Sequence, residues 1–287
     1  MAKNNIIEEA LANSPNRRSL FKKLAVAGAT LSAASLPLAA QVSPSPSDVV
    51  QFALNLEYLE AEFYSIATTG LNIAQRGIPI DGIGKTGPTT TAFGKVNLGN
   101  NLIITARSAN DITDDEMAHV ITLRTALSNN GVTPIAKPPI NLDALAPMGA
   151  SLANQQTFLV LARAFEDIGV SAYNGGAVFL SGSPFLMTAA RISAVEGEHT
   201  ANIRLQIARL GIPTAALDGA DIPPPPSGPQ FISANKANGL TAFRTSGQVL
   251  YLAYGMVANA TSGGFFPMGV NGVLNMSSGP ATAANLS

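Results

Sequence analysis

The 287-residue sequence contains no cysteine, only two histidines, and only 12% charged residues. The absence of cysteine excludes disulfide frameworks, thiolate zinc sites and cysteine nucleophiles. The 17 Lys+Arg and 18 Asp+Glu nearly balance, and no basic patch with interleaved aromatic residues occurs, which excludes a nucleic-acid partner. With 46% hydrophobic residues, the chain is long enough for one large domain or two small ones with a sizeable core. Imidazole chemistry is confined to the two histidines.

The amino-terminal segment combines a basic stretch with a mild apolar one. Its basic part reads Arg17-Arg18-Ser19-Leu20-Phe21-Lys22-Lys23, and residues 24–40 carry no charge. This pattern resembles the twin-arginine export signal, whose cargo crosses the membrane already folded. We therefore predict a signal segment over 1–40, with the twin-arginine translocase as a partner and a periplasmic or extracellular destination. An uncleaved anchor stays open. Without these residues, 12 Lys+Arg face 16 Asp+Glu, and the formal charge is about −4.

The rest of the chain predicts an all-α fold, a four-helix bundle with a long crossover. After a linker at 41–47, the bundle is expected over 48–211, with helical spacing of apolar residues in four stretches and Gly and Pro between them. The predicted helices cover residues 48–67, 101–129, 149–180 and 184–210. A glycine-rich insertion at 69–100 is expected to hold a small hairpin, and four prolines within 133–147 indicate the crossover.

The chain beyond the bundle changes in composition. Residues 212–232 read as a proline-rich linker. Residues 233–287 are expected to form a C-terminal helix over 233–259 and an irregular tail that packs on the bundle.

Both histidines follow a glutamate by three positions, in Glu116-Met117-Ala118-His119 and Glu196-Gly197-Glu198-His199. This spacing places carboxylate and imidazole on one helical face, where they can converge on one metal ion. Because the chain has nine glutamates, the chance that both histidines carry one at this position is roughly one in a thousand.

The other two predicted helices each contain a glutamate followed by a tyrosine seven residues later. These pairs are Glu57 with Tyr64 and Glu166 with Tyr173. Seven residues are about two helical turns, so each pair shares a face. The chain therefore reads as two repeats, each with a Glu-x6-Tyr helix and a Glu-x-x-His helix.

This ligand pattern resembles that of the ferritin-like carboxylate-bridged dinuclear metal proteins, in which two helices supply one glutamate each and two others supply Glu-x-x-His. Three stretches of the chain are similar to the desiccation-related ferritin-like proteins. They are Asn55-Leu56-Glu57-Tyr58-Leu59-Glu60-Ala61-Glu62-Phe63-Tyr64 and the late regions Phe243-Arg244-Thr245 and Gly264-Phe265-Phe266-Pro267. The resemblance implies that Glu116 and Glu196 bridge two ions. It also implies that Glu57 and Glu166 cap the ions, and that His119 and His199 bind one each.

The electrostatics favour metal binding independently. Four buried glutamates would carry about −4, which is costly to bury unpaired and which two divalent ions would neutralise. The alternative is that these carboxylates are protonated. Oxygen-rich ligation with one imidazole per ion suits two iron or two manganese ions. The resemblance further implies that Tyr64 and Tyr173 take part in catalysis, as hydrogen-bond donors or radical traps.

Other acidic residues close to the motifs have separate expectations. Glu60 could face the same core as Glu57, as a ligand or a neighbour of the ligands. Glu62 and Glu198 are expected to be solvated. Asp115 could orient His119, although a surface carboxylate is the favoured interpretation, and Asp167 is expected to pair with an arginine.

The sequence thus predicts an exported protein with redox chemistry at a dinuclear centre, in which reduced ions meet dioxygen or peroxide. Iron oxidation and peroxide removal are the leading reactions, and the sequence leaves a homo-oligomer open. The alternative is a non-enzymatic, stress-protective or envelope-structural protein with a structural or degenerate metal site. The fold alone does not choose between these functions.

Overall fold

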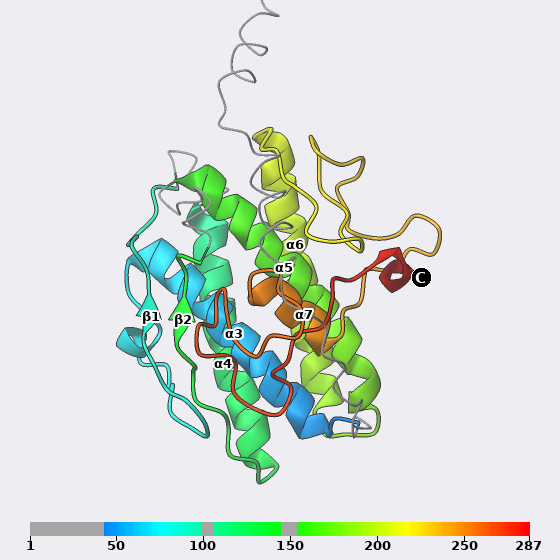
Figure 1. Ribbon diagram of the computed structural model, residues 1–287. Coiled ribbons are helices and arrows are strands. Elements are labelled where there is room, and N and C mark those ends of the chain that lie inside the picture. Colours follow the sequence, from blue (N-terminus) through cyan, green and yellow to red (C-terminus); the bar gives the residue numbers. More distant parts are fainter. Residues whose placement is uncertain (1–42, 99–105, 145–153) are drawn as a thin grey trace, which may run out of the picture. The chain divides into compact units, whose positions relative to one another are not determined.

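Four long helices dominate the computed structural model, which describes residues 43–98, 106–144 and 154–287 (Figure 1). They are α3 (Pro46–Thr69), α4 (Arg107–Asn129), α5 (Gln155–Ala177) and α6 (Leu186–Arg209). The predicted all-α bundle with a long crossover is confirmed. The predicted signal segment and the helix starts expected at 101 and 149 lie outside the described residues.

The ends of α3 and α5 follow from local capping chemistry. The Ser45 hydroxyl accepts a hydrogen bond from the Asp48 amide, and the Asp48 carboxylate accepts one from the Ser45 amide, which closes a capping box at the start of α3. Gly70 ends this helix with φ +82°, a left-handed conformation that favours glycine. Asn154 caps α5 by accepting from the Thr157 amide at 3.1 Å. These limits place the candidate glutamates near the middle of their helices.

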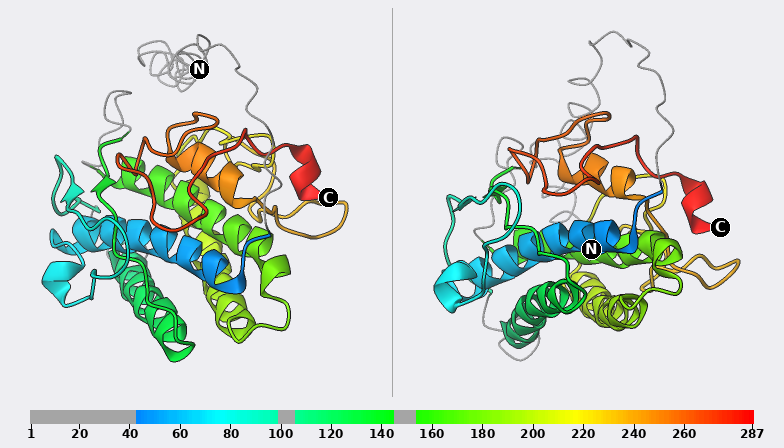
Figure 2. Two further views of the ribbon diagram at one scale, coloured as in Figure 1. Left: turned by 60° about the horizontal axis from the view of Figure 1, so that its bottom comes forward. Right: turned by 90° about the horizontal axis from the view of Figure 1, so that it is seen from below.

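The helices form layers around a buried α3 (Figure 2). α3 packs against α4, and α5 packs against α6. α3 and α5 form a middle layer, with α4 and α6 on one side and the chain that follows α6 on the other. Because it is covered from both sides, α3 buries 19 of its 24 residues, three glutamates among them.

The insertion between α3 and α4 does not fold on itself as the predicted hairpin. Within the described residues, it contributes the short helix η1 (Ala74–Arg76) and the strand β1 (Thr89–Thr90). β1 pairs in parallel with β2 (Ile140–Asn141), which belongs to the crossover between α4 and α5. The Ile83 amide likewise donates to the Pro134 carbonyl at 3.0 Å. The glycine-rich insertion lacks the apolar alternation of a hairpin, and the crossover satisfies its backbone groups instead.

Glu62 is buried rather than solvated, which corrects the expectation from the sequence. It lies on α3 and is 1% exposed, and its carboxylate lies 3.4 Å from the Lys137 ammonium. Lys137 belongs to the crossover and also donates to the Gly87 carbonyl at 2.8 Å. The crossover therefore covers this side of α3 and supplies the buried carboxylate with a charged partner.

The predicted C-terminal helix over 233–259 is much shorter. α7 spans only Ser246–Ala253, and it packs against α5. Thr245 forms a capping box that starts α7, while Gly255 at φ +83° follows its end. Upstream, Ala234 and Thr241 form an antiparallel bridge where the sequence predicts helix. The remaining tail is irregular apart from η5 (Ala283–Leu286), and it lies over α3 and α5.

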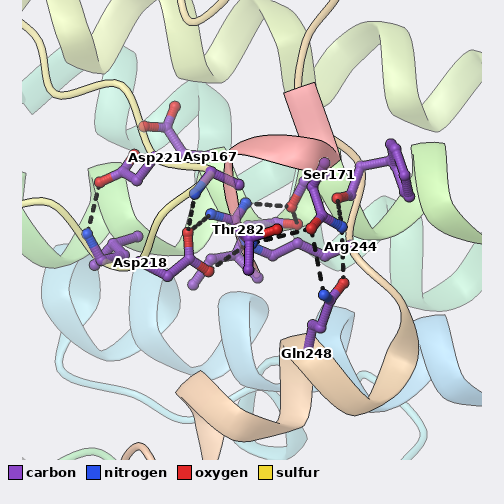
Figure 3. A network of polar contacts seen from close by, with 12 residues as sticks. Asp167, Ser171, Asp218, Asp221, Arg244, Gln248 and Thr282 are labelled. Carbon is purple, nitrogen blue, oxygen red and sulfur yellow. Dashed lines mark hydrogen bonds and ion pairs between the residues drawn. The ribbon is translucent and has the colours of Figure 1, made fainter. Parts of the chain in front are cut away.

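Three buried arginines attach the segment after α6 to the bundle. Arg163 contacts Asp221, and Arg204 donates to the Ile222 carbonyl at 2.7 Å. Figure 3 shows the contacts of the third, Arg244. Arg244 makes two contacts with Asp218, at 2.6 and 2.9 Å, and its guanidinium also donates to the Ser171 hydroxyl on α5. Arg163 on α5 and Arg204 on α6 share the Asp167 carboxylate, at 2.7 and 2.8 Å. The predicted pairing of Asp167 with an arginine is thus confirmed.

Among the described residues, no helix is long and apolar enough to cross a membrane.

Candidate metal centre

All six residues predicted as ligands come together between the four long helices. Each is buried, with at most 7% of its surface exposed. α3 supplies Glu57 and α5 supplies Glu166, while α4 and α6 each supply a glutamate and a histidine. The ligand atoms form two overlapping groups, each within 4.8 Å, namely Glu57, Glu116, His119 and Glu196, and Glu116, Glu166, Glu196 and His199. Glu116 and Glu196 belong to both groups, as residues bridging two ions would.

The two histidines direct Nδ1 at this cluster of carboxylates. His119 Nδ1 lies 3.3 Å from Glu57 and 3.5 Å from Glu196. His199 Nδ1 lies 3.0 Å from Glu116 and 3.2 Å from Glu166. The two rings are 6.1 Å apart between centroids. Each imidazole thus contacts the acidic residues of one of the two groups.

Two tyrosines hold the outer glutamates from the opposite helix. The Tyr64 hydroxyl on α3 donates a short hydrogen bond to Glu166 on α5, and the Tyr173 hydroxyl on α5 donates one to Glu57 on α3. On each helix the tyrosine follows the glutamate by seven residues, so this reciprocal pairing requires α3 and α5 to run antiparallel. The two halves of the centre are therefore related by an approximate two-fold axis.

Much of the polar surface of the cluster has no hydrogen-bond partner within the described parts of the chain. The unpartnered buried atoms include one oxygen each of Glu57 and Glu166, both oxygens of Glu116 and Glu196, and Nδ1 of His119 and His199. Buried carboxylate oxygens and imidazole nitrogens left in this state are costly. Divalent metal ions would satisfy all of them, so the residues present fit a dinuclear centre.

Burial and mutual repulsion shift the pKa values of the carboxyl groups. Burial raises the pKa of Glu57 to about 7, against the opposing attraction of His119. Burial and then the charge of Glu116 hold the pKa of Glu196 well above its usual range. Glu116 differs because its close contacts with both histidines outweigh burial and lower its pKa to about 2. Protons thus compensate part of the negative charge that metal ions would otherwise neutralise.

The histidines carry much of the positive charge in the metal-free centre. Burial alone would lower the pKa of His199, but the charge of Glu166 and the contact with Glu116 outweigh it and raise the pKa to about 12. The pKa of His119 is also raised, because Glu57 and the other carboxylates outweigh burial. Metal ions binding at Nδ1 would have to displace these protons.

Glu60 is a fifth buried carboxylate beside the six predicted ligands. Burial and the charge of Glu196 raise its pKa well above the usual range, although Glu60 belongs to neither group of ligand atoms. A Cβ built at Gly169 on α5 would lie 2.5 Å from Glu196 Oε2 and 3.3 Å from Glu60 Oε1. Only glycine leaves this space to the two carboxylates. Gly169 is not among the predicted site residues, although a glycine between Glu166 and Tyr173 inside a helix is a visible signal in the sequence.

Asp115 is a surface carboxylate, 51% exposed, as the favoured interpretation predicts, but it also contacts His199 and not the histidine of its own motif. Its Oδ2 lies 3.1 Å from His199 Nε2, which links α4 to α6. The sequence suggested only His119, four residues further along α4, as a partner of Asp115. Helical spacing does not reveal a partner on another helix. Glu198, by contrast, is exposed as expected.

A model of the ferritin-like domain family matches residues 45–209, the stretch that runs from the cap of α3 to the last residue of α6. This range covers more than half of the chain and includes all six residues of the two groups. No curated protein sequence matches the chain significantly.

Proposed function

The chain belongs to the ferritin-like family, and from this premise we propose that it binds two iron or two manganese ions and uses them in redox chemistry. The observation that carries the proposal is the pair of buried ligand groups that share Glu116 and Glu196. The proposed reactions are iron oxidation and the consumption of dioxygen or peroxide. The proposed family position is close to the desiccation-related ferritin-like proteins, and the proposed benefit is protection under stress.

Charge and ligand type support this choice of ions. The four glutamates of the two groups carry about −4 when ionised, and two divalent ions carry the matching +4. Each ion would have carboxylate oxygens and a single imidazole nitrogen. This donor set suits iron and manganese and lacks the thiolates that select softer metals.

The side chains of this protein would position and balance the ions. When bound, two such ions supply electrons and open coordination positions for dioxygen or peroxide. Glu116 and Glu196 would bridge them, with Glu57 and Glu166 at the outer positions. Tyr64 and Tyr173 orient these outer carboxylates by donating hydrogen bonds, and the two tyrosines are the proposed catalytic residues. Glu60 can hold a proton beside Glu196 without leaving the site.

We also propose that the protein is exported by the twin-arginine translocase, on the basis of the Arg17-Arg18 pair and the uncharged stretch after it. Export of a folded chain suits a centre that has to acquire its ions before the protein leaves the cytoplasm. A cysteine-free chain also suits an oxidising destination.

One observation favours a second function, in which the ions only stabilise the bundle. All six ligands are at most 7% exposed, and both tyrosine hydroxyls are hydrogen-bonded to ligands. A centre enclosed to this degree would suit a structural metal site in a stress-protective protein.

The deciding experiment begins with the metal content of the full chain purified from its native host. About two iron or manganese ions per chain are expected, and the loaded protein should then consume dioxygen or peroxide. Glu116→Gln should abolish both loading and turnover, whereas the matched control Glu198→Gln, which changes an exposed glutamate on α6, should abolish neither. Full loading without turnover, with a large loss of melting temperature in chelator, would favour the structural function. No binding of either ion after reconstitution would overturn the proposal.

A further inference from the structure

The two halves of the candidate metal centre differ at the outer nitrogen of the histidine. The reciprocal contacts across the centre match in most respects, because each half has one outer glutamate held by one tyrosine and one Glu-x-x-His pair. His199 Nε2, however, lies 3.1 Å from Asp115 Oδ2. Within the described residues, His119 Nε2 has no such partner. The position that corresponds to Asp115, directly before the glutamate of the other motif, is Val195.

A carboxylate at Nε2 affects how well an imidazole binds a metal ion through Nδ1. It accepts the Nε2 proton, which fixes the tautomer that leaves Nδ1 free, and it holds the ring in one orientation. It also raises the basicity of Nδ1. Removing such a partner commonly lowers metal affinity by about 10 to 100-fold. His199 has this support in the structure and His119 does not.

The halves also differ at one more pair of positions, but this difference favours neither ion. Glu60 follows Glu57 by three residues, and its counterpart after Glu166 is Gly169. The Glu60 carboxylate lies beside Gly169 together with Glu196. Because Glu196 belongs to both ligand groups, the effect of Glu60 on Glu196 acts on both positions.

We propose that Asp115 makes the two ion positions unequal, so that the position at His199 binds a divalent ion more tightly and fills first. Asp115 acts as a positioning residue, through the ring of His199. The inference rests on the proposed binding of two ions. It adds an order of filling and a residue that sets this order.

The test uses the metal-free full chain and Mn²⁺. Crystals loaded with one equivalent of Mn²⁺ per chain should show stronger anomalous scattering at the His199 position than at the His119 position. In solution, a titration against a competing chelator should resolve two affinities that differ by about tenfold or more. This measurement on the unaltered protein needs no variant to fold.

Variants then assign the difference to Asp115. Asp115→Asn should weaken the tighter affinity by about 10 to 100-fold and bring the two affinities together. Asp114→Asn is the matched control, because it removes the same charge from the adjacent, 73% exposed residue and should leave both affinities unchanged. Val195→Asp adds the missing carboxylate and should strengthen the His119 position, which a structural role of Asp115 alone would not produce.

The outcomes separate this inference from the proposed function. The order of filling would be overturned if one equivalent of Mn²⁺ occupied both positions equally or filled the His119 position first. Either result would leave the dinuclear centre standing. Unchanged affinities in Asp115→Asn would overturn the role of Asp115. No Mn²⁺ binding to the unaltered chain would overturn both proposals together.

Discussion

Gly169→Ala should separate the stability of the bundle from its capacity to bind metal. Gly169 lies on α5, one turn after Glu166, and faces the carboxylates of Glu196 and Glu60. Alanine favours the helix over glycine by about 0.5–1 kcal/mol. The added methyl group would nevertheless lie only 2.5 Å from Glu196 Oε2. The substitution therefore strengthens the helix and disturbs one shared ligand.

The size of that disturbance follows from the contact distance. An ordinary contact begins at 3.4 Å, so Glu196 Oε2 would have to move by about 0.9 Å. Metal–ligand distances are defined to about 0.2 Å, so this shift would take the oxygen out of ligand range. Because Glu196 belongs to both ligand groups, both ion positions should lose affinity, each by about tenfold or more.

The assay compares two glycine substitutions in metal-free and metal-loaded protein. Gly197→Ala on α6 is the matched control, because its Cβ would meet nothing within 4 Å. Urea unfolding in chelator should show both variants within about 1 kcal/mol of the unaltered protein. Competition with a chelator should show weakened Mn²⁺ binding in Gly169→Ala alone. Unchanged affinity in Gly169→Ala would refute the assignment of Glu196 as a shared ligand.

Three further predictions concern charge. Lys137→Met should destabilise the fold by about 3–5 kcal/mol in urea unfolding, because it leaves the Glu62 carboxylate buried without its cation. The double variant Lys137→Met with Glu62→Leu should recover most of this loss. Arg244→Ala should cost a similar 3–5 kcal/mol by leaving Asp218 unpaired, whereas Arg209→Ala at an exposed position should cost less than about 0.5 kcal/mol. Mn²⁺ affinity should rise with pH below about 12, because the raised pKa of His199 keeps a proton on the ring that the ion has to displace. Calorimetry in buffers of different ionisation enthalpy should detect this proton release near neutral pH. Binding without proton release would contradict these pKa shifts.

The sequence predicts the candidate ligands well because their arrangement is local. In a helix, Glu116 and His119 share a face by spacing alone, and the same holds for Glu196 and His199. Once four helices are predicted, these faces have to meet in the core, since buried carboxylates need common partners. The structure brings the six residues together as this reasoning expects, while their role as metal ligands stays a prediction.

What the sequence does not predict depends on contacts between distant segments. Glu62 looks solvated until Lys137, 75 residues later, covers it from the crossover. Asp115 contacts a histidine on another helix, 84 residues away. The parallel pairing of β1 with β2 also depends on where the insertion meets the crossover. Periodicity and capping residues carry no information on such contacts.

The tail that covers α3 ties completion of the bundle to the synthesis of a segment far along the chain. The Asn55 side chain on α3 donates to the Asn271 carbonyl at 2.9 Å and accepts from the Asn271 amide at 3.0 Å, although these residues are 216 positions apart. Within the described residues, α3 is the helix that is synthesised first, and it is covered by a segment that follows it by about 200 residues. We expect ribosome-bound chains that stop at residue 260 to stay open to proteases, while released full-length chains become resistant. Synthesis order would then act as a check on completeness, because a chain that stops before Asn271 cannot enclose α3.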